Sequence, residues 1–342
     1  MNKTSPNRKL PLRFWIITII LCTLILIRII LPFAVKWYIN STLQKSQDFT
    51  GKVDKVNMNL LRGAYSIRGI SLDIKSADTA IPFISVQSID FLINWGSLFK
   101  GDFVARGEIR VPEMDYIIGV TKVPQGKPVT QILSELFPFR IDLLVLSDGK
   151  VRVRNATTNP QYEINMTDID ASILNLTNSL RVAEDLYASM KLKGRLMKTG
   201  KLEIAMIFNP VSKRPVFDMN ATLTRLDITE LNNAARAHAE LSFEDGTFAA
   251  RTQLATKKDI ISGWIKPVFV NLQVLSKEDK NLLQKFWEGL TGAGSEVLEG
   301  TDNRLTTTIP ITIPLKASDE DYFSVVTGAL ITAFGRAVFP DI

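Results

Sequence analysis

Apolar residues follow two patterns along this chain, one continuous and one alternating. The continuous run begins at Phe14, passes through Trp15, Ile20 and Leu26, and ends at Leu31 without an acidic residue. As a helix, such a run spans roughly 27 Å, close to the hydrocarbon thickness of a bilayer. Because a helix satisfies its own backbone hydrogen bonds, the run predicts a transmembrane helix over residues 14–31.

Basic residues before the run predict its orientation. Four of them precede it, namely Lys3, Arg8, Lys9 and Arg13. No comparable cluster follows directly, so we expect residues 1–13 to form a cytoplasmic tail and the rest of the chain to lie outside the cytoplasm. A cleaved signal peptide is the alternative. The run is longer than a typical signal core and no small-residue cleavage site follows it, which favours an uncleaved single-pass anchor.

From residue 51 onward, apolar and polar residues mostly alternate. The period of two is clearest in residues 56–60, 70–74, 89–93, 141–145, 151–153, 202–208 and 217–223. Each segment predicts a strand with one apolar face, and the whole predicts roughly 14 strands, mostly antiparallel. Turn-forming residues at 147–149, 159–160 and 244–246 are expected to separate strands. The pattern alone leaves open whether the apolar faces cover each other, as in a sandwich, or line an open trough.

Helical periodicity is restricted to a few segments. They are a connector at 32–50 and shorter stretches at 130–137, 229–240, 276–298 and 318–339. Thr229, Ser276 and Ser318 are the expected caps of the last three. The two C-terminal helices have apolar stripes, which must be covered by the sheet, a membrane or a partner. We therefore expect a mainly β chain with few helices: an N-terminal transmembrane helix, a long curved antiparallel sheet, and C-terminal amphipathic helices.

A strand at 305–315 lies between these two helices and contains two prolines. Pro310 and Pro314 alternate with the apolar residues, so both remove a backbone donor from the same side of the strand. Proline interrupts the hydrogen bonds of a sheet interior. This strand is therefore expected at a sheet edge, with its other side blocked against further pairing.

Charge and composition exclude several functions. Five of the 41 basic residues and no acidic residue lie in the first 31 positions, which leaves the remainder balanced at 36 basic to 35 acidic residues. There is no basic footprint for nucleic acid. Cys22 is the only cysteine and His238 the only histidine. Without nucleophile, nucleotide-binding or zinc motifs, we expect no catalytic, cofactor-binding or metal-binding residues, and no enzyme.

Several blocks of sequence resemble the AsmA-like family, in its domain of unknown function 748 branch. The first block covers residues 31–72 and includes Arg62, Gly63, Tyr65 and Gly69. Further blocks lie at 136–155, 174–179, 223–248 and 263–275. The resemblance implies a protein of the bacterial inner membrane, with residues 51–342 as a periplasmic β-rich domain rolled into a taco-like groove. It implies no catalytic residues; for Tyr65 and the glycines we expect a structural role.

Two functions remain as expectations. The first is non-enzymatic lipid binding, lipid transfer or envelope biogenesis, with phospholipid acyl chains in an apolar β-groove. The candidate groove residues are Ile70, Leu72, Phe91, Leu143, Ile204, Met206 and Met219. The alternative is a structural or interaction protein that supports outer-membrane protein assembly or envelope integrity, with a protein partner added to a sheet edge.

Overall fold

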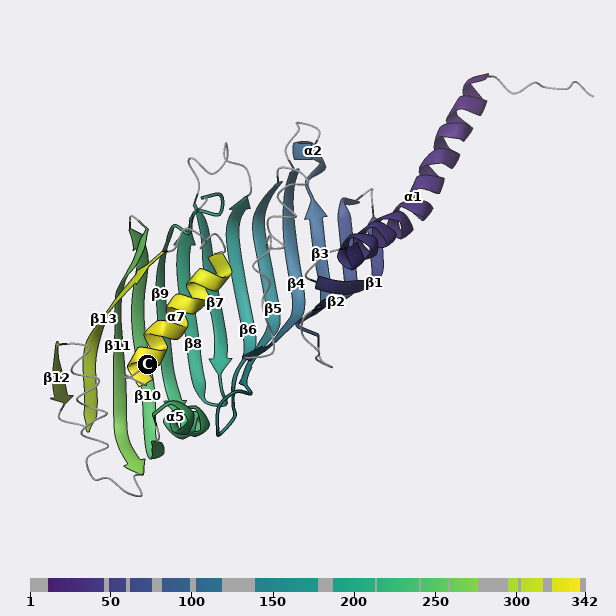
Figure 1. The fold of residues 1–342 in the computed structure, drawn as a ribbon. Helices are drawn as coiled ribbons and strands as arrows, with labels where there is room; N and C mark the ends of the chain where they lie inside the picture. Colours follow the sequence, from purple (N-terminus) through teal and green to yellow (C-terminus); the bar gives the residue numbers. More distant parts are fainter. Residues whose placement is uncertain are drawn as a thin grey trace, which may run out of the picture.

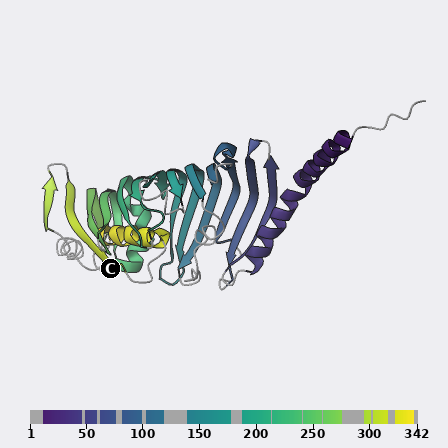
Figure 2. The same ribbon diagram turned by 90° about the horizontal axis from the view of Figure 1, so that it is seen from above.

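A single 13-stranded sheet dominates the computed structural model of the chain (Figure 1). Seen from above, the sheet is long and curved, with one helix lying on it and another leaving at its end (Figure 2). The expected fold class, a mainly β chain with an N-terminal apolar helix and few other helices, is confirmed. The structure describes residues 12–45, 49–59, 62–75, 82–98, 103–118, 139–177, 187–212, 214–239, 241–257, 259–275, 295–300, 303–315 and 322–338.

The strands follow one another in the sheet almost in sequence order. Their bounds are β1 Phe49–Asn59, β2 Ala64–Ile74, β3 Ile84–Ile93, β4 Phe103–Ile118, β5 Phe139–Asn155, β6 Tyr162–Thr177, β7 Ala188–Leu196, β8 Gly200–Phe208, β9 Phe217–Asp227, β10 Ser242–Lys257, β11 Ile260–Leu275, β12 Ser295–Gly300 and β13 Arg304–Pro314. The helices are α1 Leu12–Lys45, α2 Trp95–Leu98, η2 Ile228–Leu231, α5 Asn232–Ala239 and α7 Tyr322–Val338. All pairs are antiparallel except β4–β5, which is parallel.

The parallel pair needs a crossover connection between β4 and β5. That connection, with the expected helix at 130–137, lies outside the described residues. Elsewhere between β1 and β11, consecutive strands are antiparallel neighbours, whereas β11 pairs with β13 and β12 lies beyond it. In β8, buried and exposed residues alternate without exception, as its sequence predicts.

Helix α1 joins the expected transmembrane run and most of the expected connector into one continuous element. The connector was expected to reach residue 50, which is wrong, because the helix ends at Lys45 and β1 begins at Phe49. The last turns of α1 lie against β1, the first strand of the sheet. The Val53 N–H donates to Asn40 Oδ1 (2.7 Å), and Asn40 Nδ2 donates to the Val53 carbonyl (3.2 Å). Lys36 donates to the next carbonyl, that of Asp54. The Asn40 amide therefore occupies the hydrogen-bonding groups of an edge strand as a neighbouring strand would, which covers the edge.

Substitution of Asn40 tests whether its amide protects the backbone of β1, the edge strand. In Asn40→Leu, the buried Val53 N–H and carbonyl lose their partners, at about 1–3 kcal/mol for each unsatisfied group. We expect faster amide exchange in β1 by hydrogen-exchange mass spectrometry. Thr42→Ala, on the exposed side of α1, is the control and should leave β1 exchange unchanged. Equal exchange in both variants would contradict the edge-capping role of Asn40.

Two of the three expected turns are wrong, because the residues form irregularities inside long strands. Residues 147–149 lie within β5 and residues 244–246 within β10, and both places show shifts in pairing register. Asp148 and Gly246 have positive φ, which Asp and Gly tolerate. Residues 159–160 do lie between β5 and β6, as expected. The same residue types that make hairpin turns therefore make bulges here.

The expected helices are partly confirmed. Helix α7 lies within 318–339, and η2 with α5 covers 228–239, close to the expected 229–240. The N-cap of η2 is Asp227, whose side chain accepts from the Thr229 N–H, so Thr229 was wrong as the cap. Of the segment 276–298, residues 276–294 lie outside the described residues and 295–298 begin β12, so a helix extending to 298 is wrong.

The proline-bearing strand, β13, was expected at the edge of the sheet. This is wrong, because β12 pairs beyond it. However, β12 pairs only with residues 304–308 of β13. The Leu315 N–H donates toward β11, to the Asp259 carbonyl (2.8 Å), so alternation directs the proline positions the other way. Pro310 and Pro314 thus remove donors from the stretch of β13 that no described strand pairs on that side.

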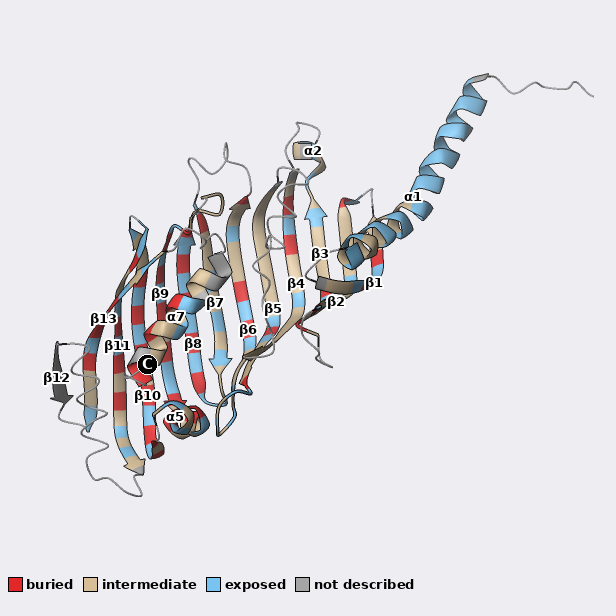
Figure 3. Cartoon of the chain, in the orientation of Figure 1, coloured by how far each residue is buried: buried red, intermediate tan, exposed pale blue. Residues whose placement is uncertain are grey.

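The C-terminal half of the sheet is covered by its own helices. Ala329, Ala333 and Ala337 of α7 are buried together with the apolar residues of β8 to β13 that point to the same side. Buried residues accordingly cluster under α5 and α7 (Figure 3). Of the three covers considered for the stripe of the last helix, the sheet is the one observed.

Substitutions on opposite sides of α7 test this packing. Ala333 is 0 % exposed and Ile331 is 69 % exposed. Ala333→Asp buries a charge, so we expect a loss of at least about 3 kcal/mol in unfolding free energy or release of α7. Ile331→Asp should melt like the wild type. Indistinguishable melts for the two variants would contradict the observed orientation of α7.

Candidate apolar binding face

The sheet has two chemically different faces. We call the face that packs against α5, α7 and the end of α1 the helix-bearing face, and the opposite one the outer face. Strand alternation and pairing register assign each residue to one of them. For example, a side chain added at Gly107 would contact Phe91 and Leu144, so these three positions share the helix-bearing face.

Helices cover the helix-bearing face over only part of the sheet. Over β8 to β13, its apolar residues are buried in one core with α7. Over β2 to β5, most large apolar residues of the same face keep partial exposure, whereas β6 packs in part against the core, and no described helix lies over β3 to β5 (Figure 3). The half-exposed residues include Ile67, Ile70, Leu72, Ile84, Ile89, Phe91, Ile109, Met114, Tyr116, Leu144, Leu146, Val151 and Val153. We call this set the open apolar face.

An irregularity that runs across neighbouring strands, which we call the crease, keeps these residues on one face. In each of β1 to β6, two consecutive apolar residues of the open side are separated by two residues instead of one. The pairs are Val53/Val56, Ile67/Ile70, Val86/Ile89, Ile109/Pro112, Leu146/Gly149 and Met166/Ile169. From β1 to β4 they lie beside one another in the pairing register, and Leu146 of β5 lies beside Ile109. In β6 the step is displaced, because Leu146 pairs with Ala171 and Val151 with Met166. Within the steps, Gly69, Val111, Asp148 and Asp168 have positive φ, which turns the strand and restores the apolar side.

Gly69 tests the importance of the crease. Its φ is +63°, and an added Cβ would collide with the Asp54 side chain. Gly69→Ala should therefore lower the unfolding free energy by about 1–2 kcal/mol from backbone strain alone, and more if Asp54 cannot move. Gly96→Ala, in α2 and without positive φ, should cause no loss in denaturant melts. A Gly69→Ala variant as stable as wild type would show that the crease tolerates ordinary backbone geometry.

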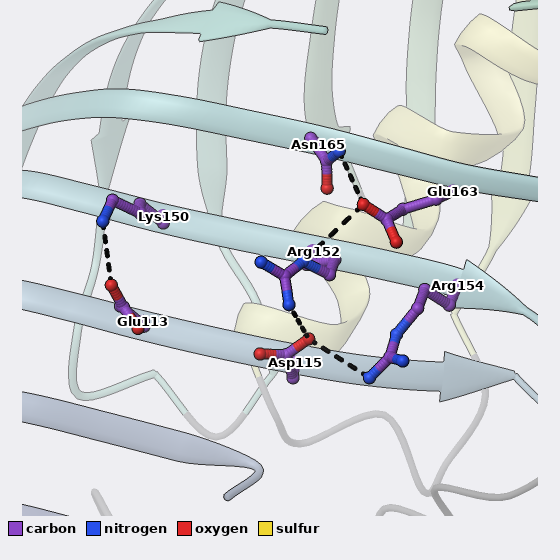
Figure 4. Close-up of polar contacts among 7 residues, drawn as sticks. All are labelled: Glu113, Asp115, Lys150, Arg152, Arg154, Glu163 and Asn165. Atoms are coloured by element: carbon purple, nitrogen blue, oxygen red, sulfur yellow. Dashed lines mark hydrogen bonds and ion pairs between the residues drawn. The ribbon is translucent and has the colours of Figure 1, made fainter. Parts of the chain in front are cut away.

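The outer face is hydrated and charged near the middle of the sheet. Lys150 pairs with Glu113 (2.9 Å), and Asp115 pairs with Arg152 (3.3 Å) and Arg154 (3.5 Å), across β4 and β5 (Figure 4). The hydrogen bond to Glu113 raises the pKa of Lys150. Such exposed pairs add little stability. Their effect is to keep this middle part of the outer face in water.

The structure separates the seven expected groove residues into three groups. Ile70, Leu72 and Phe91 belong to the open apolar face. Leu143, next to Leu144 in the strand, points to the outer face. Ile204, Met206 and Met219 are buried in the C-terminal core, Met219 with 0 % exposure. The protein's own side chains cover these last three, so we leave them out of the candidate site.

The open apolar face also includes residues that the sequence pattern did not reveal. In β4, Ile109, Met114 and Tyr116 share a face although their spacing is not even throughout. The step at Arg110–Val111 hides the alternation. The available signal was the charged residues, which change from even positions (Glu108, Arg110) to odd ones (Glu113, Asp115) across that step.

The residues of the family resemblance lie just before β2 and in its first half. Gly63 and Gly69 adopt positive φ, and Arg62 is exposed. Tyr65 lies on the helix-bearing face, and burial raises the pKa of its phenol. Because Gly63 has no side chain, its backbone can lie close to the Ile93 carbonyl. The Ile93 N–H donates to the Gly63 carbonyl (2.8 Å).

The anchor residues lie on an unpacked helix. Phe14, Trp15, Ile20 and Leu26 are exposed, and α1 from Arg13 onward is long and apolar enough to cross a membrane. A membrane anchor and a signal sequence both have this property. Within the described part of the chain, no cluster of His, Cys, Asp or Glu could hold a metal ion. No family model matches the chain, and no curated protein is significantly similar to it.

Proposed function

We propose that this protein is a non-enzymatic lipid-binding or lipid-transfer protein of the cell envelope, and that acyl chains lie on the open apolar face. One observation carries the proposal: the same apolar face is covered by helices over β8 to β13 and left half-exposed over β2 to β5. A contiguous exposed apolar patch of this kind marks a binding surface. An apolar ligand without a fixed polar contact fits it best, because the half-exposed residues are almost all aliphatic or aromatic.

The dimensions and energies suit acyl chains. Four strands, each about 4.8 Å wide in the sheet, make the open face about 19 Å wide. One leaflet of a bilayer's hydrocarbon core is about 15 Å deep, so a leaflet-length chain fits across it. Each CH₂ group removed from water contributes about 0.8 kcal/mol, so a chain binds by burial alone.

The position of the face relative to α1 supports the same proposal. Helix α1 contacts β1, so the open half of the sheet is the half next to the apolar helix. We propose that α1 is an uncleaved anchor in the bacterial inner membrane, with the N-terminus cytoplasmic and the sheet periplasmic. Membership of the AsmA-like family is part of this proposal. It rests on the sequence blocks and on a curved sheet of the expected kind.

The alternative, a scaffold that accepts a partner strand, has less support from the sheet edges. At β1, Asn40 and Lys36 already occupy backbone groups of the edge. At the other end, Pro310 and Pro314 remove donors from the unpaired stretch of β13. Strand addition requires free donors and acceptors in register. Among described strands, the short β12 is the remaining edge.

Neighbouring substitutions on opposite faces of β2 test the lipid proposal. Ile70 lies on the open apolar face, and Ser71 lies on the outer face between Lys52 and Ser85. In Ile70→Asp, a charge would face the ligand, so we expect a several-fold loss of lipid that copurifies with the full-length protein, measured by mass spectrometry of washed samples. Ser71→Asp adds the same charge to the hydrated face and should retain the wild-type amount.

Melts of both variants separate loss of binding from loss of fold. If Ile70→Asp unfolds, Ile70→Ser serves instead. Equal lipid in both folded variants, or no acyl lipid with the wild-type protein, would refute binding at this face. Crosslinks from a photoreactive residue at position 109 to protein rather than lipid would support the scaffold alternative.

A further inference from the structure

Exposed apolar side chains of the sheet gather along one rim. We call the rim at which β3 ends and α2 lies the α2 rim. Outside α1 and α7, the large apolar residues that are exposed in the described part of the chain are Leu92, Leu174, Tyr187, Ile207, Val216, Ile260 and Trp264. Each lies at or near a strand end on the α2 rim, because β3, β6 and β8 end there and β7, β9 and β11 begin there.

These residues point to the outer face, away from the open apolar face. Leu92 follows Phe91, and Leu174 follows Ile173, both of which point to the helix-bearing side. Ile207 is 56 % exposed between the buried Met206 and Phe208. With Leu143, they form an apolar margin on the outer face. Farther from the rim the same face carries Lys193 and Arg195 of β7, paired with Glu203 and Asp168.

Helix α1 runs toward this rim. Leu43 of α1 lies near Gly51 of β1, Asn40 bonds to Val53, and Lys36 bonds to Asp54. Earlier residues of α1 thus contact later residues of β1, so α1 is antiparallel to β1. Asn59, at the other end of β1, lies at the α2 rim. The free end of α1 accordingly extends past the same rim as α2 (Figure 1).

The distances bring the rim close to the level of the membrane. The five residues of β1 beyond Asp54 extend about 17 Å toward the rim. On α1, the apolar run ends at Leu31, only about 7.5 Å from Lys36. Although α1 diverges from β1, the rim next to it reaches the depth at which the transmembrane run would enter the bilayer.

We propose that the apolar margin on the outer face, around Leu92, Leu143 and Leu174, rests in the surface of the membrane that anchors α1. This inference rests on the proposed anchoring of α1 and is independent of lipid binding on the open apolar face. Arg106 lies between Leu92 and Leu143 in the register and is exposed, in position for lipid phosphate. The occupant is the bilayer interface, where apolar and cationic side chains together are favoured.

Fluorescence quenching in vesicles tests the margin in the full-length protein. Single cysteines at Leu92, Leu174 and, as control, Lys193 are introduced in a Cys22→Ser background and labelled with an environment-sensitive dye. The protein is reconstituted in phosphatidylcholine–phosphatidylglycerol vesicles, with or without lipids that have a spin label near the headgroup. We expect loss of emission at positions 92 and 174 and none at 193.

A label on the native Cys22 tests the anchoring of α1 separately from the contact of the apolar margin with the membrane. Cys22 lies in the apolar run of α1, and a label there reports anchoring through lipids spin-labelled deeper in the chain. Quenching at Cys22 without quenching at positions 92 and 174 would overturn the membrane-resting margin and leave the anchor intact. An unquenched Cys22 label would overturn both. Equal quenching at position 193 would also refute the margin, because the charged part of the face would then be in lipid.

Discussion

A sheet of one layer has an apolar face that must be kept from water, and the rest of this structure follows from how that face is covered. Over β8 to β13 the chain uses its own helices, with the alanines of α7 allowing close approach to the strands. Over β2 to β5 the described helices leave the face half-exposed. Since hydrophobic burial is the main favourable term in folding, an uncovered half is costly unless something else covers it. In the proposed function, an apolar ligand supplies the missing cover.

The crease allows the uncovered half to remain both curved and apolar. An even strand alternation would give a gently twisted sheet, whereas an aligned row of two-residue steps bends β1 to β5 at the same level. The register between β1, β2, β3 and β4 is constant across the crease, because neighbouring strands take the step together. The bend therefore leaves the ladder of hydrogen bonds almost intact.

Two stretches of unpaired backbone, along β1 and along the part of β13 that β12 leaves unpaired, are blocked against strand addition by different means. At β1 a side-chain amide satisfies an exposed backbone pair, and at β13 proline removes the donors. An open sheet of this length presents a long edge, which would otherwise recruit further strands. In the function proposed here, these blocked stretches and the open apolar face favour a ligand on the face over a partner strand at an edge.

Local rules determined much of this protein from sequence. The apolar run, the period of two, and the stripe of α7 are patterns that neighbouring residues set by themselves, so the apolar helix, the β class and the last helix were predicted correctly. The sequence could not distinguish a turn from a bulge at 147–149 and 244–246, because Asp and Gly supply the same positive φ to both. Nor could it separate Met219 in the core from Phe91 on the open face, since both are inward-facing apolar residues of strands. Only the tertiary structure decided that difference, because it depends on where a helix distant in the sequence packs.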